Sequence, residues 1–245
     1  MIKWVPLCAL LLLGNAELAQ LPAVTVKGRV VVLSSVENKK KPSDSGVVVW
    51  LTPIPRSSVQ SFKPVPLESR QRFRLVQKNK RFDPHVLVVQ VGSVVDFPNL
   101  DPFFHNVFSL FEGKRFDLGL YESGTSRATV FDRPGICYVF CNIHPEMSAV
   151  ILVLDTPYFG VSNSAGEISI FDVPSGRYQL HVWNERSTPE ALKGLRREIT
   201  LTEETANLGT LPMTESRKLV LPHKNKYGRD YDEPQPMIPG YEPGR

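Results

Sequence analysis

Short runs of β-branched and aromatic residues recur along most of the chain, separated by turn residues. They begin at 24–35 and 45–53, follow one another quickly between Phe73 and Asp155, and resume over 158–183 and 199–211. Twenty-one prolines and sixteen glycines fall largely between these runs and favour many short strands over helices. The pattern predicts an all-β protein built as β-sandwiches.

The segments between and after these runs predict how the chain is divided. With 245 residues, 42% of them hydrophobic, the chain is long enough to bury one large or two small cores. Residues 55–71 are rich in Pro, Ser and Arg and are predicted to be a linker. Residues 213–245 are charged, rich in Pro and Gly and without apolar periodicity, which predicts a disordered tail.

The first nineteen residues have the pattern of a secretory signal peptide. Lys3 precedes a run of about nine apolar residues, and cleavage is expected after Ala16 or Ala19. Cys8 lies within the apolar run, too early for a lipoprotein acceptor. We therefore expect a periplasmic or secreted protein with no stable membrane insertion after the signal is removed. A short membrane anchor is the alternative, although the run is shorter than a membrane-spanning helix.

A short segment, 141–147 (CNIHPEM), carries the most specific chemistry of the chain. It places a thiolate, an imidazole and a thioether at offsets of 0, 3 and 6 residues, and these soft donors suit copper. The segment is too short for a structural zinc site with four Cys or His ligands. His105 can supply the second imidazole of a His₂Cys site with a weak axial Met. The predicted ligands of a single copper ion are therefore His105, Cys141, His144 and Met147.

Cys137 is the second cysteine that remains after removal of the signal peptide. In an extended strand it lies roughly 13 Å from Cys141, beyond the roughly 7 Å Cα separation that a disulfide tolerates. It is interpreted as a small buried core residue. The alternative is a dinuclear copper centre bridged by both cysteines, but a separation of four strand residues is too large for a shared metal.

The stretch 73–154 resembles the cupredoxins, and most closely the amicyanin and pseudoazurin group. The resemblance is carried by FDP…LVVQVGSVVDFPN, HNV, PGICYVFCNIHPEM and SAVILV, in this order. It implies a Greek-key sandwich over 72–155 with a type 1 mononuclear copper site. It also implies that the side chain of Asn106 ties the His105 strand to the Cys141 loop.

The two flanking segments, 24–54 and 156–212, resemble the halves of a transthyretin-like sandwich, the carboxypeptidase regulatory-like domain. GRVVV…VVVWL matches its opening and SAGEISIFDVPSGRYQLHV its end. The resemblance implies that the cupredoxin sandwich is inserted into a second, Ig/transthyretin-like sandwich. The alternative is an N-terminal hairpin that packs on the first sandwich.

The resemblance implies single-electron transfer between a donor and an acceptor redox protein, with copper cycling between Cu(I) and Cu(II). No nucleophile triad, paired carboxylates or phosphate loop is visible, and five histidines are too few for a catalytic copper cluster, so no enzymatic activity is expected. A net charge of +4 with both signs dispersed does not indicate nucleic acid. A periplasmic copper carrier or chaperone and a non-redox binding module are the rival functions.

Two surface features bear on the redox partner. Phe103, Phe104 and Pro145 are expected to form an apolar patch at the copper site, unless both phenylalanines are core residues. The basic stretch 63–81 either steers an acidic partner or is an ordinary solvated linker.

Overall fold

The computed structural model describes residues 23–34, 43–54, 70–110, 113–215 and 224–231. Within these ranges nearly all regular structure is β-strand, so the prediction of an all-β protein is confirmed. The predicted signal peptide (1–19) and most of the predicted linker (55–71) lie outside the described residues.

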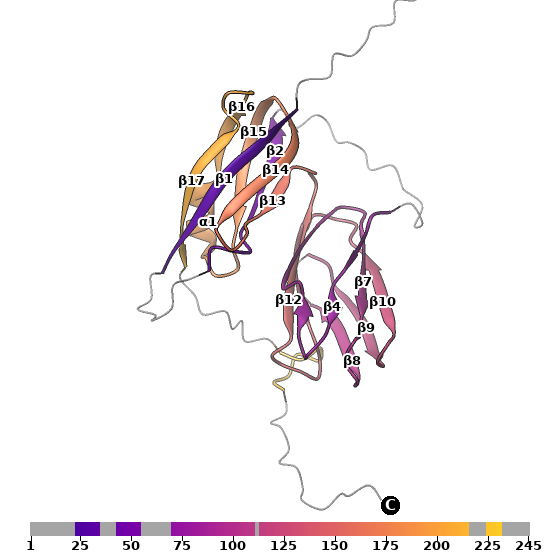
Figure 1. The fold of residues 1–245 in the computed structure, drawn as a ribbon. Helices are drawn as coiled ribbons and strands as arrows, with labels where there is room; N and C mark the ends of the chain where they lie inside the picture. Colours follow the sequence, from indigo (N-terminus) through magenta and orange to yellow (C-terminus); the bar gives the residue numbers. More distant parts are fainter. Residues whose placement is uncertain (1–22, 35–42, 55–69, 111–112, 216–223, 232–245) are drawn as a thin grey trace, which may run out of the picture.

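The strands from the two ends of the described chain form one unit, the N/C sandwich (Figure 1). Its strands are β1 (Ala23–Ser34), β2 (Val48–Ile54), β13 (Phe159–Val161), β14 (Glu167–Pro174), β15 (Gly176–Trp183), β16 (Arg197–Leu201) and β17 (Asn207–Glu215). One sheet has the order β14-β1-β17 and the other β13-β2-β15-β16. β17 extends into the segment that was predicted to be tail.

Alternation along β1 and β2 explains how the two sheets of the N/C sandwich face each other. Val26 and Val30 on β1 and Val49 and Leu51 on β2 are fully buried, while Lys27 and Arg29, which lie between the two β1 valines, are exposed. The inward residues of both sheets share one core. Strand β1 pairs antiparallel with β14 and parallel with β17, so the first strand lies between two strands from the end of the chain.

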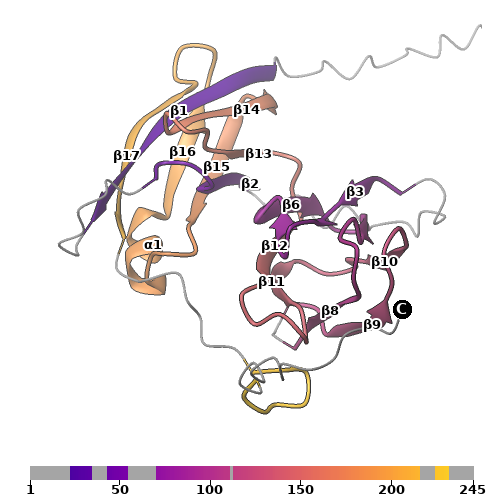
Figure 2. The same ribbon diagram turned by 60° about the horizontal axis from the view of Figure 1, so that its bottom comes forward.

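The strands between β2 and β13 form a second unit, the central sandwich, beside the N/C sandwich (Figure 2). Its strands are β3 (Arg72–Arg74), β4 (Val76–Gln77), β5 (Phe82–Asp83), β6 (Val86–Gln90), β7 (Val94–Pro98), β8 (His105–Ser109), β9 (Phe116–Tyr121), β10 (Ser126–Val130), β11 (Gly135–Phe140) and β12 (Ser148–Leu154). One sheet has the order β10-β7-β3 and the other β6-β12-β11-β8-β9, and β4 and β5 form a separate pair.

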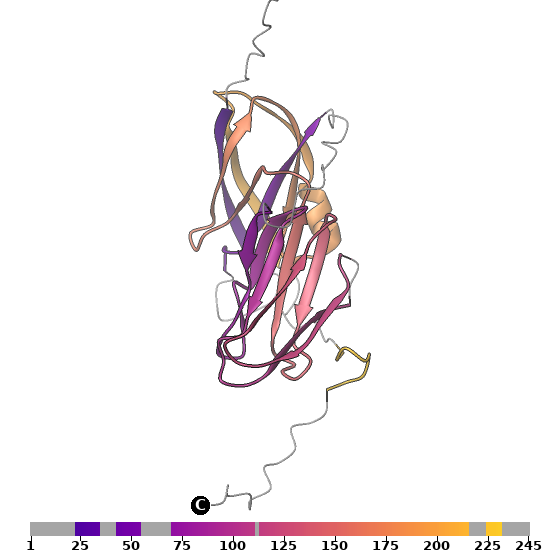
Figure 3. The same cartoon turned by 90° about the vertical axis from the view of Figure 1, so that its right-hand side faces the viewer.

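Strand β12 is buried on both faces, which accounts for its unbroken apolar sequence. Ala149, Ile151 and Val153 belong to the core of the central sandwich. The alternate residues of the same strand belong to a third cluster that includes residues of both sandwiches; this cluster consists of Val48, Val88, Val150, Leu152, Leu154 and Trp183. In Figure 3 the N/C sandwich occupies the upper part of the view and the central sandwich the lower part.

The one helix among the described residues is α1 (Pro189–Leu195), which the sequence pattern did not predict. Thr188 caps it by accepting a hydrogen bond from Ala191 N, and Pro189 occupies the first turn, where a missing N–H costs nothing. Over the part of the chain that the structure describes, no helix is long and apolar enough to cross a membrane.

Candidate metal centre

Two neighbouring strands and one loop of the central sandwich bring three of the four predicted metal ligands together, His105, Cys141 and His144. His105 is the first residue of β8, and Cys141 directly follows β11. β8 and β11 are adjacent and antiparallel, with Phe108 paired to Phe140, so the start of one lies beside the end of the other. The loop 141–147 then leads into β12.

Three potential ligand atoms face one another at this point. Cys141 Sγ lies 3.7 Å from His105 Nδ1 and 3.6 Å from His144 Nδ1, and the two Nδ1 atoms are 3.1 Å apart. Cys141 and His105 are fully buried, whereas His144 is half-buried. Within the described residues these three side chains form a group that could hold a metal ion.

The size of this triangle and its donor types fit a first-row transition metal. Bonds of about 2.0–2.1 Å to nitrogen and about 2.3 Å to sulfur space the ligands of a trigonal site about 3.5–3.8 Å apart. Both sulfur–nitrogen separations agree with this spacing, and the nitrogen–nitrogen separation is somewhat shorter. One thiolate and two imidazoles are the donors that favour copper over calcium or magnesium.

Backbone hydrogen bonds fix the shape of the loop 141–147. Cys141 N donates to Met147 O at 3.2 Å, and Met147 N donates to His144 O at 3.0 Å. Met147 is fully buried in the same core cluster as Cys141. The loop therefore folds back on itself, and its last residue packs into the core of the central sandwich.

His105 is held by a carboxylate that the sequence analysis did not identify. Asp101 Oδ2 lies 2.8 Å from His105 Nε2, which leaves Nδ1 to face Cys141. Asp101 also accepts the backbone N–H groups of Asn79 at 2.6 Å and Lys80 at 2.9 Å. A carboxylate on the far nitrogen of a histidine fixes the tautomer and orientation of a metal ligand.

The electrostatics of the triangle favour the ligand form of the thiol. Burial raises the pKa of Cys141, but hydrogen bonding to His105 and to the backbone of Asn106 outweighs it and leaves the pKa below that of an ordinary thiol. Burial lowers the pKa of His105, but Cys141 and Asp101 together raise it above the usual value. The lowered pKa makes the thiolate of Cys141 easier to form than that of an ordinary thiol, and the thiolate is the form that binds metals.

Asn106, the residue predicted to tie the His105 strand to the Cys141 loop, makes a different side-chain contact. Its Nδ2 donates to Asp117 Oδ1 on β9 at 2.7 Å. Its Oδ1 is buried and has no hydrogen-bond partner among the described residues. The side chain thus reaches toward β9, and it is the backbone of Asn106 that hydrogen-bonds to Cys141.

The surface beside the triangle is apolar. Phe103 is 36% exposed and contacts both histidine rings, with centroids 5.2 Å from His105 and 5.6 Å from His144. Phe104 is 52% exposed, and Pro145 is exposed as well. The exposure of both rings excludes the alternative that the two phenylalanines are core residues.

Cys137, His85 and His181 lie apart from the triangle. Cys137 is a free, fully buried thiol whose Sγ faces Lys114 O at 3.9 Å, and burial raises its pKa. His85 Nε2 lies 2.6 Å from Glu185 Oε2, and so links the two sandwiches. His181 belongs to the N/C sandwich, and His223 lies outside the described residues.

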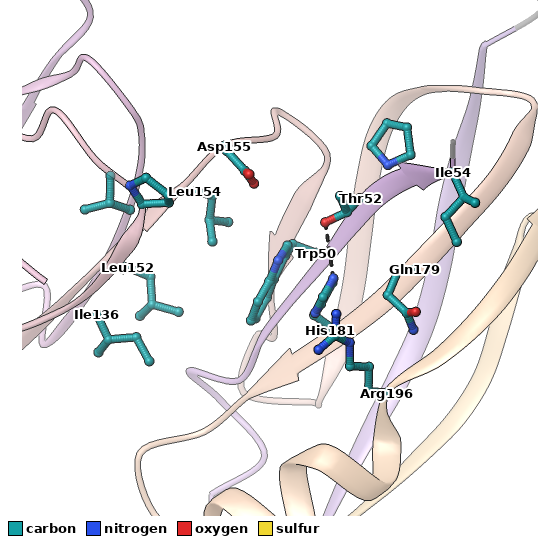
Figure 4. A pocket seen from close by; sticks show the side chains of 14 residues that line it. Trp50, Thr52, Ile54, Ile136, Leu152, Leu154, Asp155, Gln179, His181 and Arg196 are labelled. Carbon is teal, nitrogen blue, oxygen red and sulfur yellow. Dashed lines mark hydrogen bonds between the residues drawn. The ribbon is translucent and has the colours of Figure 1, made fainter. Parts of the chain in front are cut away.

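A cavity of about 410 Å³ lies between the two sandwiches (Figure 4). On one side the His181 ring stacks on Trp50 with centroids 4.8 Å apart and hydrogen-bonds to Thr52. The other side is apolar and includes Ile136 and Leu152. Its wall is thus shared by both units, away from the His/Cys/His group.

No protein-family model and no curated protein sequence matches the chain. Solved structures similar to it include a copper-containing nitrite reductase from Thermus scotoductus SA-01, with 24% identity and a TM-score of 0.33 over 40% of this chain. A purple cupredoxin from Nitrosopumilus maritimus has 22% identity and a TM-score of 0.30, covering 33% of this chain and 98% of its own. The Cu(I) form of an amicyanin mutant has 18% identity and a TM-score of 0.33, covering 40% of this chain and 97% of its own. The match spans only 24% of the length of the nitrite reductase.

These comparisons correct one prediction. The chain was expected to have no enzymatic activity, and that exclusion is wrong because the similar structures include an enzyme, the nitrite reductase, beside cupredoxins. The transthyretin-like character of the N/C sandwich stays a prediction.

Proposed function

We propose that this protein is an exported, copper-binding cupredoxin that transfers single electrons between redox proteins. His105, Cys141, His144 and Met147 would hold one copper ion, and copper bound there would supply the electron by alternating between Cu(I) and Cu(II). The observation that carries the proposal is the triangle of Cys141 Sγ and two histidine Nδ1 atoms, with sides of 3.1–3.7 Å.

The protein's own residues would keep this geometry nearly constant during electron transfer. His105 is fixed between β8 and the Asp101 carboxylate, and Cys141 is fixed by its position at the end of β11. The backbone bonds within the loop restrain His144 and Met147. Ligands that are held in place by the fold move little when the charge of the bound metal changes. Such a preorganised site lowers the free energy of reorganisation that accompanies electron transfer.

The exposed apolar patch formed by Phe103, Phe104 and Pro145 would be the face that meets a redox partner. His144 is half-buried beside this patch and is the proposed ligand nearest to solvent. Lys80 Nζ lies 5.7 Å from the centre of the Phe103 ring and adds a positive charge to the rim. An apolar centre with a charged rim suits a short-lived complex.

The proposal includes the division of the chain. The central sandwich would be the copper domain, inserted into the N/C sandwich as a transthyretin-like domain, with residues 1–19 acting as a signal for export to the periplasm or beyond. Strand β1 pairs with β14 and β17, which both follow the central sandwich in the sequence, and this pairing supports the division.

The visible and EPR spectra of the copper-loaded protein test the proposal. An intense blue colour with narrow copper hyperfine splitting is expected, and the substitution Cys141→Ser should abolish both, while the matched control Cys137→Ala should retain them. A pale, normal-copper signal from the wild type would reject the electron carrier. A seven-line mixed-valence signal would instead indicate a dinuclear centre that includes Cys137. Rapid copper loss to chelators without a redox reaction would favour the copper carrier.

A further inference from the structure

The described part of the C-terminal tail, residues 224–231, forms a compact turn that we call the tail turn. Asn225 Oδ1 accepts hydrogen bonds from Tyr227 N at 3.0 Å and Arg229 N at 3.1 Å, and Asn225 N donates to Arg229 O at 2.8 Å. Gly228 adopts φ +76°, a conformation that glycine takes without strain. These bonds lie within the segment, so the shape of the turn is set by its own sequence.

The tail turn, yellow in Figure 1, contacts the loop that carries three of the proposed ligands. Tyr231 Oη donates to Cys141 O at 2.8 Å, and Lys226 N donates to Asn142 Oδ1 at 2.9 Å. Both acceptors belong to the first two residues of the loop 141–147. Burial raises the pKa of Tyr231, so its hydroxyl remains a donor at ordinary pH.

The same turn also contacts β9. Lys226 Nζ lies 2.9 Å from Asp117 Oδ2, and Asp117 Oδ1 accepts the hydrogen bond from Asn106 Nδ2. Asn106 is adjacent to His105, and Asn142 is adjacent to Cys141. The chain of contacts Asn106–Asp117–Lys226–Asn142 therefore joins the His105 strand to the Cys141 loop through the tail.

We propose that Lys226 and Tyr231 are positioning residues that hold the Cys141 loop against β8 and so set the distance between the Cys141 thiolate and the His105 imidazole. The tail thus adds a connection between the His105 strand and the Cys141 loop, beside the hydrogen bond from the Asn106 backbone to Cys141. The inference rests on the proposed function for the identity of the metal, but the contacts themselves belong to the metal-free chain.

Hydrogen exchange of the full-length, metal-free protein tests the positioning role. The double variant Lys226→Met and Tyr231→Phe removes the contacts with Asp117 and Cys141 O and keeps the backbone bond from Lys226 N to Asn142. Amides within 141–147 should then exchange about threefold to tenfold faster for each of the two lost bonds. Lys226→Arg should restore the contact with Asp117. The control Arg229→Ala lies in the same turn with an exposed side chain and should leave loop exchange unchanged. Equal loop exchange in the wild type and the double variant would overturn the inference.

The copper-loaded protein gives a second readout that a merely structural role would not change. The double variant should shift the visible charge-transfer band and release copper to a chelator about threefold to tenfold faster per lost hydrogen bond. A blue wild type with an identical spectrum and release rate in the variant would refute the positioning role and leave the proposed function intact. A wild type that takes up no copper would refute the proposed function, and the exchange experiment would still decide the role of the tail.

Discussion

Removal of the Asp101 carboxylate provides the sharpest test of how the candidate metal centre is organised. Asp101 is only 4% exposed and accepts three hydrogen bonds, from His105 Nε2, Asn79 N and Lys80 N. Asn79 and Lys80 both have φ values near +55°, in a tight turn between β4 and β5, so the carboxylate also holds a conformation that costs non-glycine residues energy. One side chain thus supports a proposed ligand and a strained turn.

The hydrogen bonds of Asp101 give the size of the stability loss expected for the substitution Asp101→Ala. Each hydrogen bond to a charged acceptor contributes about 1.5–3 kcal/mol. Asn79 and Lys80 are exposed, so water can replace two of the three partners, whereas His105 is fully buried and loses its partner outright. The free energy of unfolding of the apoprotein should therefore fall by about 2–4 kcal/mol. Copper affinity should fall about 10- to 100-fold, as for other outer partners of metal-ligating histidines.

Two assays check these values. Urea denaturation of the apoprotein gives the stability change, and competition with a Cu(I) chelator gives the affinity. Asp101→Asn keeps one acceptor oxygen, so its stability and its copper affinity should lie between those of the wild type and of Asp101→Ala. The control is Asp132→Ala, which removes a 55% exposed carboxylate paired with Lys114 and should change neither value appreciably. Copper affinity of Asp101→Ala within threefold of the wild type would refute the idea that Asp101 orients His105.

Three further predictions concern stability. Gly113→Ala should cost about 1–3 kcal/mol in urea denaturation, because its Cβ would lie 2.6 Å from Cys137 Sγ and from a backbone oxygen. A stable Gly113→Ala protein would contradict this packing. The hydrogen bond to Glu185 raises the pKa of His85, so the contact stabilises the folded state below pH about 6.5 and this contribution is lost as the pH rises through the folded-state pKa. His85→Asn should remove that pH dependence, worth at most about 1 kcal/mol, from thermal melts at pH 5 to 8. Thr188→Ala should lower stability by about 0.5–2 kcal/mol through loss of the α1 cap, and Thr188→Ser should not.

The parts of the molecule that could be predicted from sequence are those encoded over short distances. Alternation along β1 and the unbroken apolar run of β12 are local, and they sufficed for the all-β prediction. The spacing of Cys141, His144 and Met147 is also local, so the loop was recognisable as a candidate site. The structure brings the His105, Cys141 and His144 side chains together.

The remaining features depend on contacts between distant segments. Asp101 stands four residues before His105 on an irregular segment, where sequence spacing does not determine whether two side chains meet. Tyr231 reaches Cys141 across 90 residues from a segment with no apolar periodicity. The compactness of the tail turn comes from the side chain of Asn225, a type of contact that composition alone does not reveal.

The double burial of β12 has a consequence for how separable the two halves of this protein are. Val150, Leu152 and Leu154 form a stripe on the face of β12 turned away from the core of the central sandwich. If residues 72–155 were produced alone, this stripe would become an exposed apolar strip, and such strips promote self-association. We expect size-exclusion chromatography to show that fragment as oligomers and its triple Thr variant at these positions as a monomer. We therefore expect the central sandwich to need the N/C sandwich to remain soluble, because the N/C sandwich covers this apolar stripe.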